Sequence, residues 1–88
     1  MSIKIIKTPI DGLLIIEPQI HYDHRGFFYE SYNEDTFKKA GIAYKFIQDN
    51  YSFNRNKYTF RGVHYQESPF SQTKLVRCPR GKIIDYAI

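Results

Sequence analysis

The sequence predicts a small all-β domain of the sandwich or barrel type, with a single short helix. Short apolar or alternating runs recur along the 88 residues, and close turn signals separate them. Aromatic residues make up 17% of the chain, with eight tyrosines and seven phenylalanines, a composition that suits pleated surfaces. One segment alone carries the caps and the charge pattern of a helix. We expect residues 1–88 to belong to one domain.

The first third of the chain predicts short strands joined by tight turns. Strands are expected over residues 3–8 (IKIIKT) and 13–18 (LLIIEP), with the turn signal PIDG between them. The segment HYDHRG, residues 21–26, predicts a second turn that closes on its glycine. The run FFYESYN, residues 27–33, alternates between two faces and predicts a third strand.

A helix is predicted near residues 34–40. Asn33 can cap its first turn, which contains two acidic residues, and two lysines occupy its last turn, as the helix dipole favours. Gly41 follows and can end the helix. The helix offers Phe37 and Ala40 to a core, so we expect it to be short and peripheral.

The rest of the chain again predicts β structure. Strands are expected over residues 43–53, 58–66, 73–78 and 82–88, with NRNK, ESPFSQ and CPRGK as the loops and turns between them. The last strand pattern runs to Ile88 with no turn after it, and an unpartnered apolar strand favours edge pairing. We therefore expect the strand to continue and the chain to be truncated.

Composition narrows the class of protein further. The formal net charge of +4 favours anionic partners, although plain solubility explains it equally well. A single cysteine, Cys78, forms no internal disulfide, as is usual in a reducing compartment. The first ten residues, MSIKIIKTPI, contain no apolar core of signal-peptide length, and no stretch of the 88 residues approaches transmembrane length. A soluble, cytoplasmic protein is expected, without a membrane partner.

His64 is the strongest candidate for acid–base chemistry. The pKa of a free histidine side chain is about 6.5, so a modest shift of this pKa makes the side chain a base at neutral pH. In FIQDNYS, the side chains of Gln48 and Asn50 share one strand face, and a buried row of amides needs a polar occupant. The alternatives are a hydrogen-bonded core histidine and a solvated strand face.

Basic side chains nearby could complete a pocket for an anionic substrate. Lys74 begins the strand after HYQ and could stabilise an oxyanion or enolate, although a surface lysine at a strand entrance is the ordinary alternative. Arg25, Arg61 and Arg77 could hold phosphates, because the guanidinium fork matches phosphate geometry.

Other chemistries find little support in the sequence. His21 and His24 lie in a turn with only Asp23 near, so no metal is expected. Cys78 has no paired histidine, and there is no glycine-rich phosphate loop. The aromatic and basic residues are not clustered as in nucleic-acid-binding sheets, so no nucleic-acid partner is expected.

Four segments together carry a resemblance to one family. DHRGFFYES, FIQDNYSFN, FRGVHYQ and TKLVR…GKIIDYAI resemble, in order and spacing, the N-terminal half of the dTDP-4-dehydrorhamnose 3,5-epimerases. The resemblance implies a partial cupin-type jelly roll, also called a double-stranded β-helix. It implies a homodimer in which N-terminal strands are exchanged. It also implies catalysis without a metal or an organic cofactor.

The resemblance also implies a reaction and roles for individual residues. Such enzymes invert C3 and C5 of a 4-keto-6-deoxyhexose attached to dTDP, in the biosynthesis of dTDP-rhamnose for cell-surface polysaccharides. His64 would be the base, and Lys74 would stabilise charge on the C4 oxygen. The nucleotide-sugar would contact Gln48, Asn50 and Arg61 and, across the dimer interface, Arg25, Phe28 and Glu30.

The same resemblance limits what this chain is expected to do alone. The aspartate that orients the base and the tyrosine that acts as the acid are expected beyond Ile88, so the isolated chain should be catalytically poor. Arg61 and His64 alternate on a regular strand, so a bulge or twist at Gly62 is needed to bring both to one site.

Three functions stay open on the sequence. The first is the 3,5-epimerase reaction on dTDP-4-dehydro-6-deoxy-D-glucose. The second is a related nucleotide-sugar monoepimerase or 3,4-ketoisomerase, which uses the same base chemistry. The third is a non-catalytic half-cupin that binds a sugar nucleotide.

Overall fold

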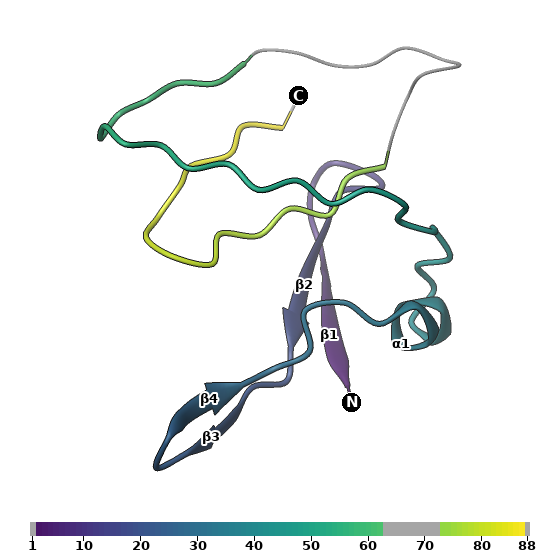
Figure 1. Ribbon diagram of the computed structural model, residues 1–88. Helices are drawn as coiled ribbons and strands as arrows, with labels where there is room; N and C mark the ends of the chain where they lie inside the picture. The colour runs from purple at the N-terminus through teal and green to yellow at the C-terminus, as the bar shows by residue number, and fades with distance from the viewer. Residues whose placement is uncertain (1, 63–72, 88) are drawn as a thin grey trace. The chain divides into compact units, whose positions relative to one another are not determined.

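Among the residues that the structure describes, the regular elements lie in the first half of the chain. The computed structural model describes residues 2–62 and 73–87. In these residues the elements are, in order, β1 (Ile3–Lys7), β2 (Leu14–Pro18), β3 (His21–Asp23), β4 (Gly26–Phe28) and α1 (Glu34–Lys39) (Figure 1). The strands form two antiparallel pairs, β1–β2 and β3–β4. The regular structure is therefore mainly β with one short helix, as the sequence predicts.

The chain divides into two units, Met1–Lys45 and Phe46–Ile88. All five regular elements of the described residues belong to the first unit. The expectation that residues 1–88 form one domain stays a prediction.

The β1–β2 hairpin confirms the first two predicted strands. Its register pairs Ile3 with Pro18 and Lys7 with Leu14, so both strands are paired along their full length. The Thr8 hydroxyl holds the connecting turn, because it donates to the backbone oxygen of Leu13 at 2.8 Å. A proline fits at the end of β2 because a terminal strand position need not donate to the ladder.

The β3–β4 hairpin forms where the sequence predicts a turn followed by a long strand. The predicted turn is present but is shorter than HYDHRG, since His21 and Asp23 already pair with Phe28 and Gly26. The prediction of a strand over residues 27–33 is wrong, because β4 ends at Phe28. A strand extends only as far as its partner supplies ladder bonds, and β3 begins at His21.

Helix α1 begins as predicted, with Asn33 as its N-cap. Asn33 has extended backbone angles, and its Oδ1 accepts a hydrogen bond from the backbone N–H of Thr36 at 3.0 Å. Tyr32, just before the cap, packs edge-to-face on Phe37 with 4.9 Å between ring centroids. Positions N′ and N4 of a helix meet in this way in a hydrophobic staple, which sets the entry angle of the chain.

The helix ends in a Schellman motif at Gly41. The N–H of Gly41 donates to the oxygen of Lys38 at 3.1 Å, and the N–H of Ile42 donates to the oxygen of Phe37 at 2.8 Å. Gly41 has φ +93°, in the left-handed region that this motif requires and that glycine adopts without strain.

The buried residues of the described chain are Phe37 and Ile42, at 2% and 6% exposure. Phe37 was expected in the core, but Ala40 was expected there too and is exposed. The reason is the C-terminal motif, which ends the helix at Lys39 and turns Ile42 back toward the last turn. The helix is short, as predicted.

The prediction of further strands after the helix is wrong for the residues that the structure describes. Residues 43–53, 58–62, 73–78 and 82–87 form no strand, and Figure 1 draws them as plain coil. An alternating pattern supplies two suitable faces, but a strand exists only where its backbone groups find a ladder partner. The predicted loop NRNK is confirmed, because residues 55–58 form a bend and a turn. The remainder of the predicted strand 58–66 lies outside the described residues.

Candidate functional site

The predicted site residues fall in both units. Arg25, Phe28 and Glu30 lie in the first unit, and Gln48, Asn50, Arg61 and Lys74 lie in the second. His64, the predicted base, lies outside the described residues. The residues of the candidate site are therefore described one unit at a time.

Arg25 occupies the tip of the β3–β4 hairpin. Asp23 and Gly26 are the last paired residues, so only His24 and Arg25 form the loop. Tyr58 is the one non-glycine residue with positive φ in the part of the chain that the structure describes, which excludes the primed turn types here. Aspartate at the first position and glycine at the fourth are typical of a type I turn.

The Asp23 carboxylate binds Arg25 three times. Oδ1 accepts from the backbone N–H of Arg25 at 2.8 Å, and Oδ2 accepts from Nε at 3.2 Å and from Nη2 at 2.7 Å. The Arg25 guanidinium and the Arg25 backbone N–H hold the pKa of the Asp23 carboxyl below its ordinary value. Both charges are therefore present at neutral pH, and the guanidinium has a defined orientation.

Phe28 stands at the end of β4, opposite His21 in the ladder. Its ring is 67% exposed, so a flat group could stack on it. The residues on either side of it, Phe27 and Tyr29, form an aromatic row with Tyr22, with centroid distances of 6.2 Å from Tyr22 to Phe27 and 6.1 Å from Phe27 to Tyr29. Successive strand residues point to opposite faces, so Phe28 faces away from Phe27. Glu30 follows the strand and is half-buried.

In the second unit, Arg61 is held by the chain that precedes it. Its Nε donates to Oδ1 of Asn54 at 2.6 Å, and its Nη2 lies 3.4 Å from the backbone oxygen of Phe53. Arg61 is exposed, so these bonds orient the guanidinium without removing it from solvent. Gly62, which follows, has φ +128°. The bulge or twist expected at Gly62 to bring Arg61 and His64 to one site stays a prediction, because His64 lies outside the described residues.

The strand face predicted to carry Gln48 and Asn50 does not form, because residues 43–53 make no strand. The two side chains are neighbours all the same, since the amide of Gln48 donates to Oδ1 of Asn50 at 3.4 Å, a long hydrogen bond. Both residues are exposed, and Lys74 is exposed as well. That Gln48 and Asn50 contact the substrate, and that Lys74 lies near His64, stay predictions.

Asp23 and Asn54 were missed by the sequence reasoning, although each holds a predicted arginine. Asp23 had a signal: aspartate opening a four-residue turn that closes on glycine, two positions before the arginine. Asn54 had none, because it lies seven positions before Arg61 in a segment that predicts a loop.

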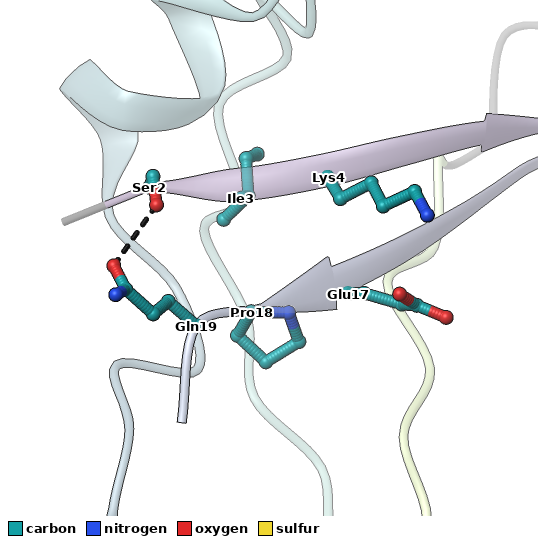
Figure 2. A pocket seen from close by; sticks show the side chains of 6 residues that line it. All are labelled: Ser2, Ile3, Lys4, Glu17, Pro18 and Gln19. Atoms are coloured by element: carbon teal, nitrogen blue, oxygen red, sulfur yellow. Dashed lines mark hydrogen bonds between the residues drawn. The ribbon is translucent and has the colours of Figure 1, made fainter. Parts of the chain in front are cut away.

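Two shallow hollows occur along the β1–β2 hairpin. Figure 2 shows the one at its open end, where the Ser2 hydroxyl donates to Oε1 of Gln19 at 3.0 Å beside Pro18. The other lies around the turn, from Lys7 to Leu14. Neither hollow is lined by a residue predicted to bind substrate.

Within residues 2–62 and 73–87 no three side chains of the metal-ligating types lie together, and no helix is long and apolar enough to cross a membrane. Because His64 lies outside these ranges, the expectation of a metal-free site stays a prediction.

Comparison with known proteins identifies the family. The family model described as dTDP-4-dehydrorhamnose 3,5-epimerase matches residues 7–88. Proteins of that name from Shigella flexneri and Methanothermobacter thermautotrophicus are 46% and 45% identical over 86 residues, 97% of this chain. A dTDP-4-dehydro-6-deoxyglucose 3-epimerase from Streptomyces bikiniensis is 35% identical over 80 residues, 90% of this chain and 40% of its own length. The search of solved structures finds no match.

These matches define first a class, the isomerases that epimerise sugars carried on dTDP. The chain belongs to the dTDP-4-dehydrorhamnose 3,5-epimerase family. It spans about half the length of the curated relatives it matches, 47% of the Shigella protein and 45% of the Methanothermobacter protein.

Proposed function

We propose that the protein catalyses epimerisation at C3 and C5 of dTDP-4-dehydro-6-deoxy-D-glucose, giving dTDP-4-dehydro-L-rhamnose. The observation that supports this most strongly is the match of residues 7–88 to the family, with 46% identity to a 3,5-epimerase over 97% of the chain. In this proposal residues 1–88 are the N-terminal portion of a cupin-type jelly roll in a cytoplasmic homodimer.

Each reaction cycle removes a proton next to the C4 ketone and returns one to the opposite face. His64 takes the proton from carbon, which leaves an enolate whose charge lies on the C4 oxygen. Lys74 stabilises that charge, which forms only after proton removal, so its contribution lowers the barrier rather than strengthening substrate binding. No cofactor is needed, because the ketone itself makes the adjacent protons acidic.

The nucleotide is bound by the arginines and the exposed ring described above. Arg61, held by Asn54, and Arg25, held by Asp23, present guanidinium groups suited to a diphosphate. Phe28 offers a ring for stacking, and Glu30 adjoins it on the chain. Gln48 and Asn50 supply neighbouring amides for the sugar hydroxyls.

Solvent deuterium tests the proposed reaction. The protein, at the length its gene encodes, is incubated with the 4-keto sugar nucleotide in D2O, and incorporation is followed by NMR. We expect deuterium at both C3 and C5. His64→Ala should lower the exchange rate by about 10²–10⁴-fold, the usual contribution of a general base, while dTDP still binds. Binding without exchange in the unmodified protein would refute the enzyme and favour the sugar-nucleotide-binding half-cupin.

A monoepimerase is the second candidate, and the 3-epimerase from Streptomyces bikiniensis is the observation that favours it. It uses the same base chemistry and differs in which centre is reprotonated on the opposite face. The NMR spectrum of the product separates the two, because inversion at C3 with retained configuration at C5 identifies the 3-epimerase. Migration of the ketone to C3 would instead identify a 3,4-ketoisomerase.

A further inference from the structure

We propose that Asp23 is a positioning residue, which aims the guanidinium of Arg25 at a phosphate group of the nucleotide-sugar. The inference rests on the proposed function, which assigns Arg25 to the nucleotide. It adds a residue that neither the family resemblance nor the comparisons assign.

The two carboxylate oxygens of Asp23 bind different parts of Arg25. Oδ1 accepts the backbone N–H of Arg25, which closes an Asx turn and sets the loop conformation. Oδ2 accepts Nε and Nη2 of the Arg25 side chain, which sets the direction of the guanidinium. One carboxylate therefore defines both the backbone and the side chain of the residue that is to contact the ligand.

The bonds to Asp23 leave one edge of the guanidinium for a ligand. They use the edge formed by Nε and Nη2. Nη1 and the second Nη2 hydrogen form the opposite edge, which has the parallel donor pair that phosphate accepts. The Arg25 side chain is 80% exposed, so that edge is open to solvent. The carboxylate thus orients the arginine without blocking it.

Stability does not explain the pair. Ion pairs exposed to this degree contribute little to folding, because solvent screens them and side-chain entropy opposes them. The gain expected from holding Arg25 is instead a smaller loss of side-chain freedom when the ligand binds. Pre-orientation of this kind raises the affinity for the nucleotide and changes the free energy of unfolding little.

Asp23→Asn separates orientation from charge. Asparagine keeps an Oδ1 acceptor for the Arg25 backbone N–H, but its NH₂ group cannot accept from the guanidinium. The change also removes a negative charge beside the ligand. If Arg25 acted only as a positive charge, dTDP would bind more tightly to this variant. If orientation matters, dTDP binds more weakly, so the two explanations predict opposite signs.

The test is a double-mutant cycle on the protein at the length its gene encodes. The dissociation constant of dTDP is measured by calorimetry for the unmodified protein, Asp23→Asn, Arg25→Ala and the double variant, and steady-state rates are measured for each. We expect Asp23→Asn to weaken dTDP binding about three- to tenfold, with KM raised and kcat nearly unchanged. The double variant should bind no more weakly than Arg25→Ala alone.

Several outcomes would overturn the inference. Unchanged or tighter dTDP binding in Asp23→Asn, with weaker binding in Arg25→Ala, removes the positioning role and leaves the proposed function intact. A loss that persists in the Arg25→Ala background shows that Asp23 acts on the hairpin alone. If Arg25→Ala binds dTDP normally, the assignment of Arg25 fails as well. Absence of deuterium exchange in the unmodified protein would be a separate failure, that of the proposed reaction.

An NMR titration checks the pairing without using activity. The pKa of the Asp23 carboxyl is held below its ordinary value of 3.8, first by the Arg25 side chain and then by its backbone N–H. The ionised pair is therefore intact above the ordinary pKa and is lost as pH falls through the lowered one. We expect a titration midpoint below 3.8 that rises in Arg25→Ala. A midpoint that is the same in both proteins would contradict the pairing.

Discussion

The two arginines proposed to bind phosphate are held by the same kind of hydrogen bond. Asp23 accepts from Nε and Nη2 of Arg25, and Asn54 accepts from Nε of Arg61. In both cases a short Asx side chain binds the inner edge of a guanidinium that stays exposed to solvent. Arginine loses little freedom on binding when its fork is already oriented, so both sites are suited to a diphosphate.

Asn54 differs from Asp23 in carrying no charge, and this permits a simple prediction. Asn54→Ala should weaken dTDP binding about three- to tenfold, because Arg61 loses its 2.6 Å bond and gains freedom that binding must remove. The dissociation constant is measured by calorimetry.

Asn56→Ala is the matched control, since it makes the same change in the same loop. Its backbone oxygen accepts from the Thr59 hydroxyl, a bond that the substitution leaves in place. Equal losses of dTDP affinity in the two variants would assign the effect to the loop rather than to Arg61.

At the scale of elements, α1 shows how a short helix becomes well defined. The helix contains six residues, too few for stability on its own. Two local motifs compensate: the staple puts Tyr32 on Phe37, and the Schellman turn bonds the N–H of Ile42 to the oxygen of the same Phe37. The two buried side chains of the described residues are Phe37 and Ile42, so α1 is the best-packed part of the first unit.

The N-cap gives a stability prediction. Asn33→Ala should lower the free energy of unfolding by about 1 kcal/mol, because the backbone N–H of Thr36 loses its 3.0 Å acceptor. The value is obtained from urea unfolding followed by circular dichroism. Asn33→Asp keeps an acceptor at the cap and should lose much less. Equal losses in the two variants would show that the cap bond does not hold the helix.

At the scale of the whole molecule, the main feature is apolar surface that is not covered. In the second unit the side chains of Ile47 and Ile84 are 88% and 81% exposed. The segments that carry them have strand-like sequences but no ladder partner among the described residues. In the first unit β1 is paired with β2, and its other edge has no strand partner among the described residues. Open edges of this kind favour strand pairing with a second chain.

We therefore expect the protein to be a homodimer in which β1 contributes to the partner's sheet. Analytical ultracentrifugation should give twice the mass of one chain. Hydrogen exchange should protect those β1 amides that point away from β2, and dilution below the dissociation constant should remove that protection. A monomer at all concentrations would refute the dimer. Protection that does not change while the dimer dissociates would refute strand exchange.

Some residues of the candidate site could be predicted from the sequence, but not all of the side chains that hold them. Charge and residue type marked Arg25 and Arg61 as possible phosphate ligands. Strand alternation predicted that Gln48 and Asn50 are neighbours, and their amides are 3.4 Å apart, although the segment forms no strand. The residue that holds Arg61 could not be found in this way, because no local pattern links it to Asn54 seven positions away. Side-chain partners outside one turn or one hairpin depend on how the chain folds back.

The sequence by itself determined the features that depend on residues only a few positions apart. These are the β1–β2 hairpin, the cap and end of α1, and the ordered motifs that identify the family. Tertiary structure alone decided that Asn54 holds Arg61 from seven positions away and that strand-like segments such as 43–53 stay unpaired in the described chain. A local pattern sets which conformations suit a segment, whereas burial and ladder bonds require a partner brought near by the rest of the chain.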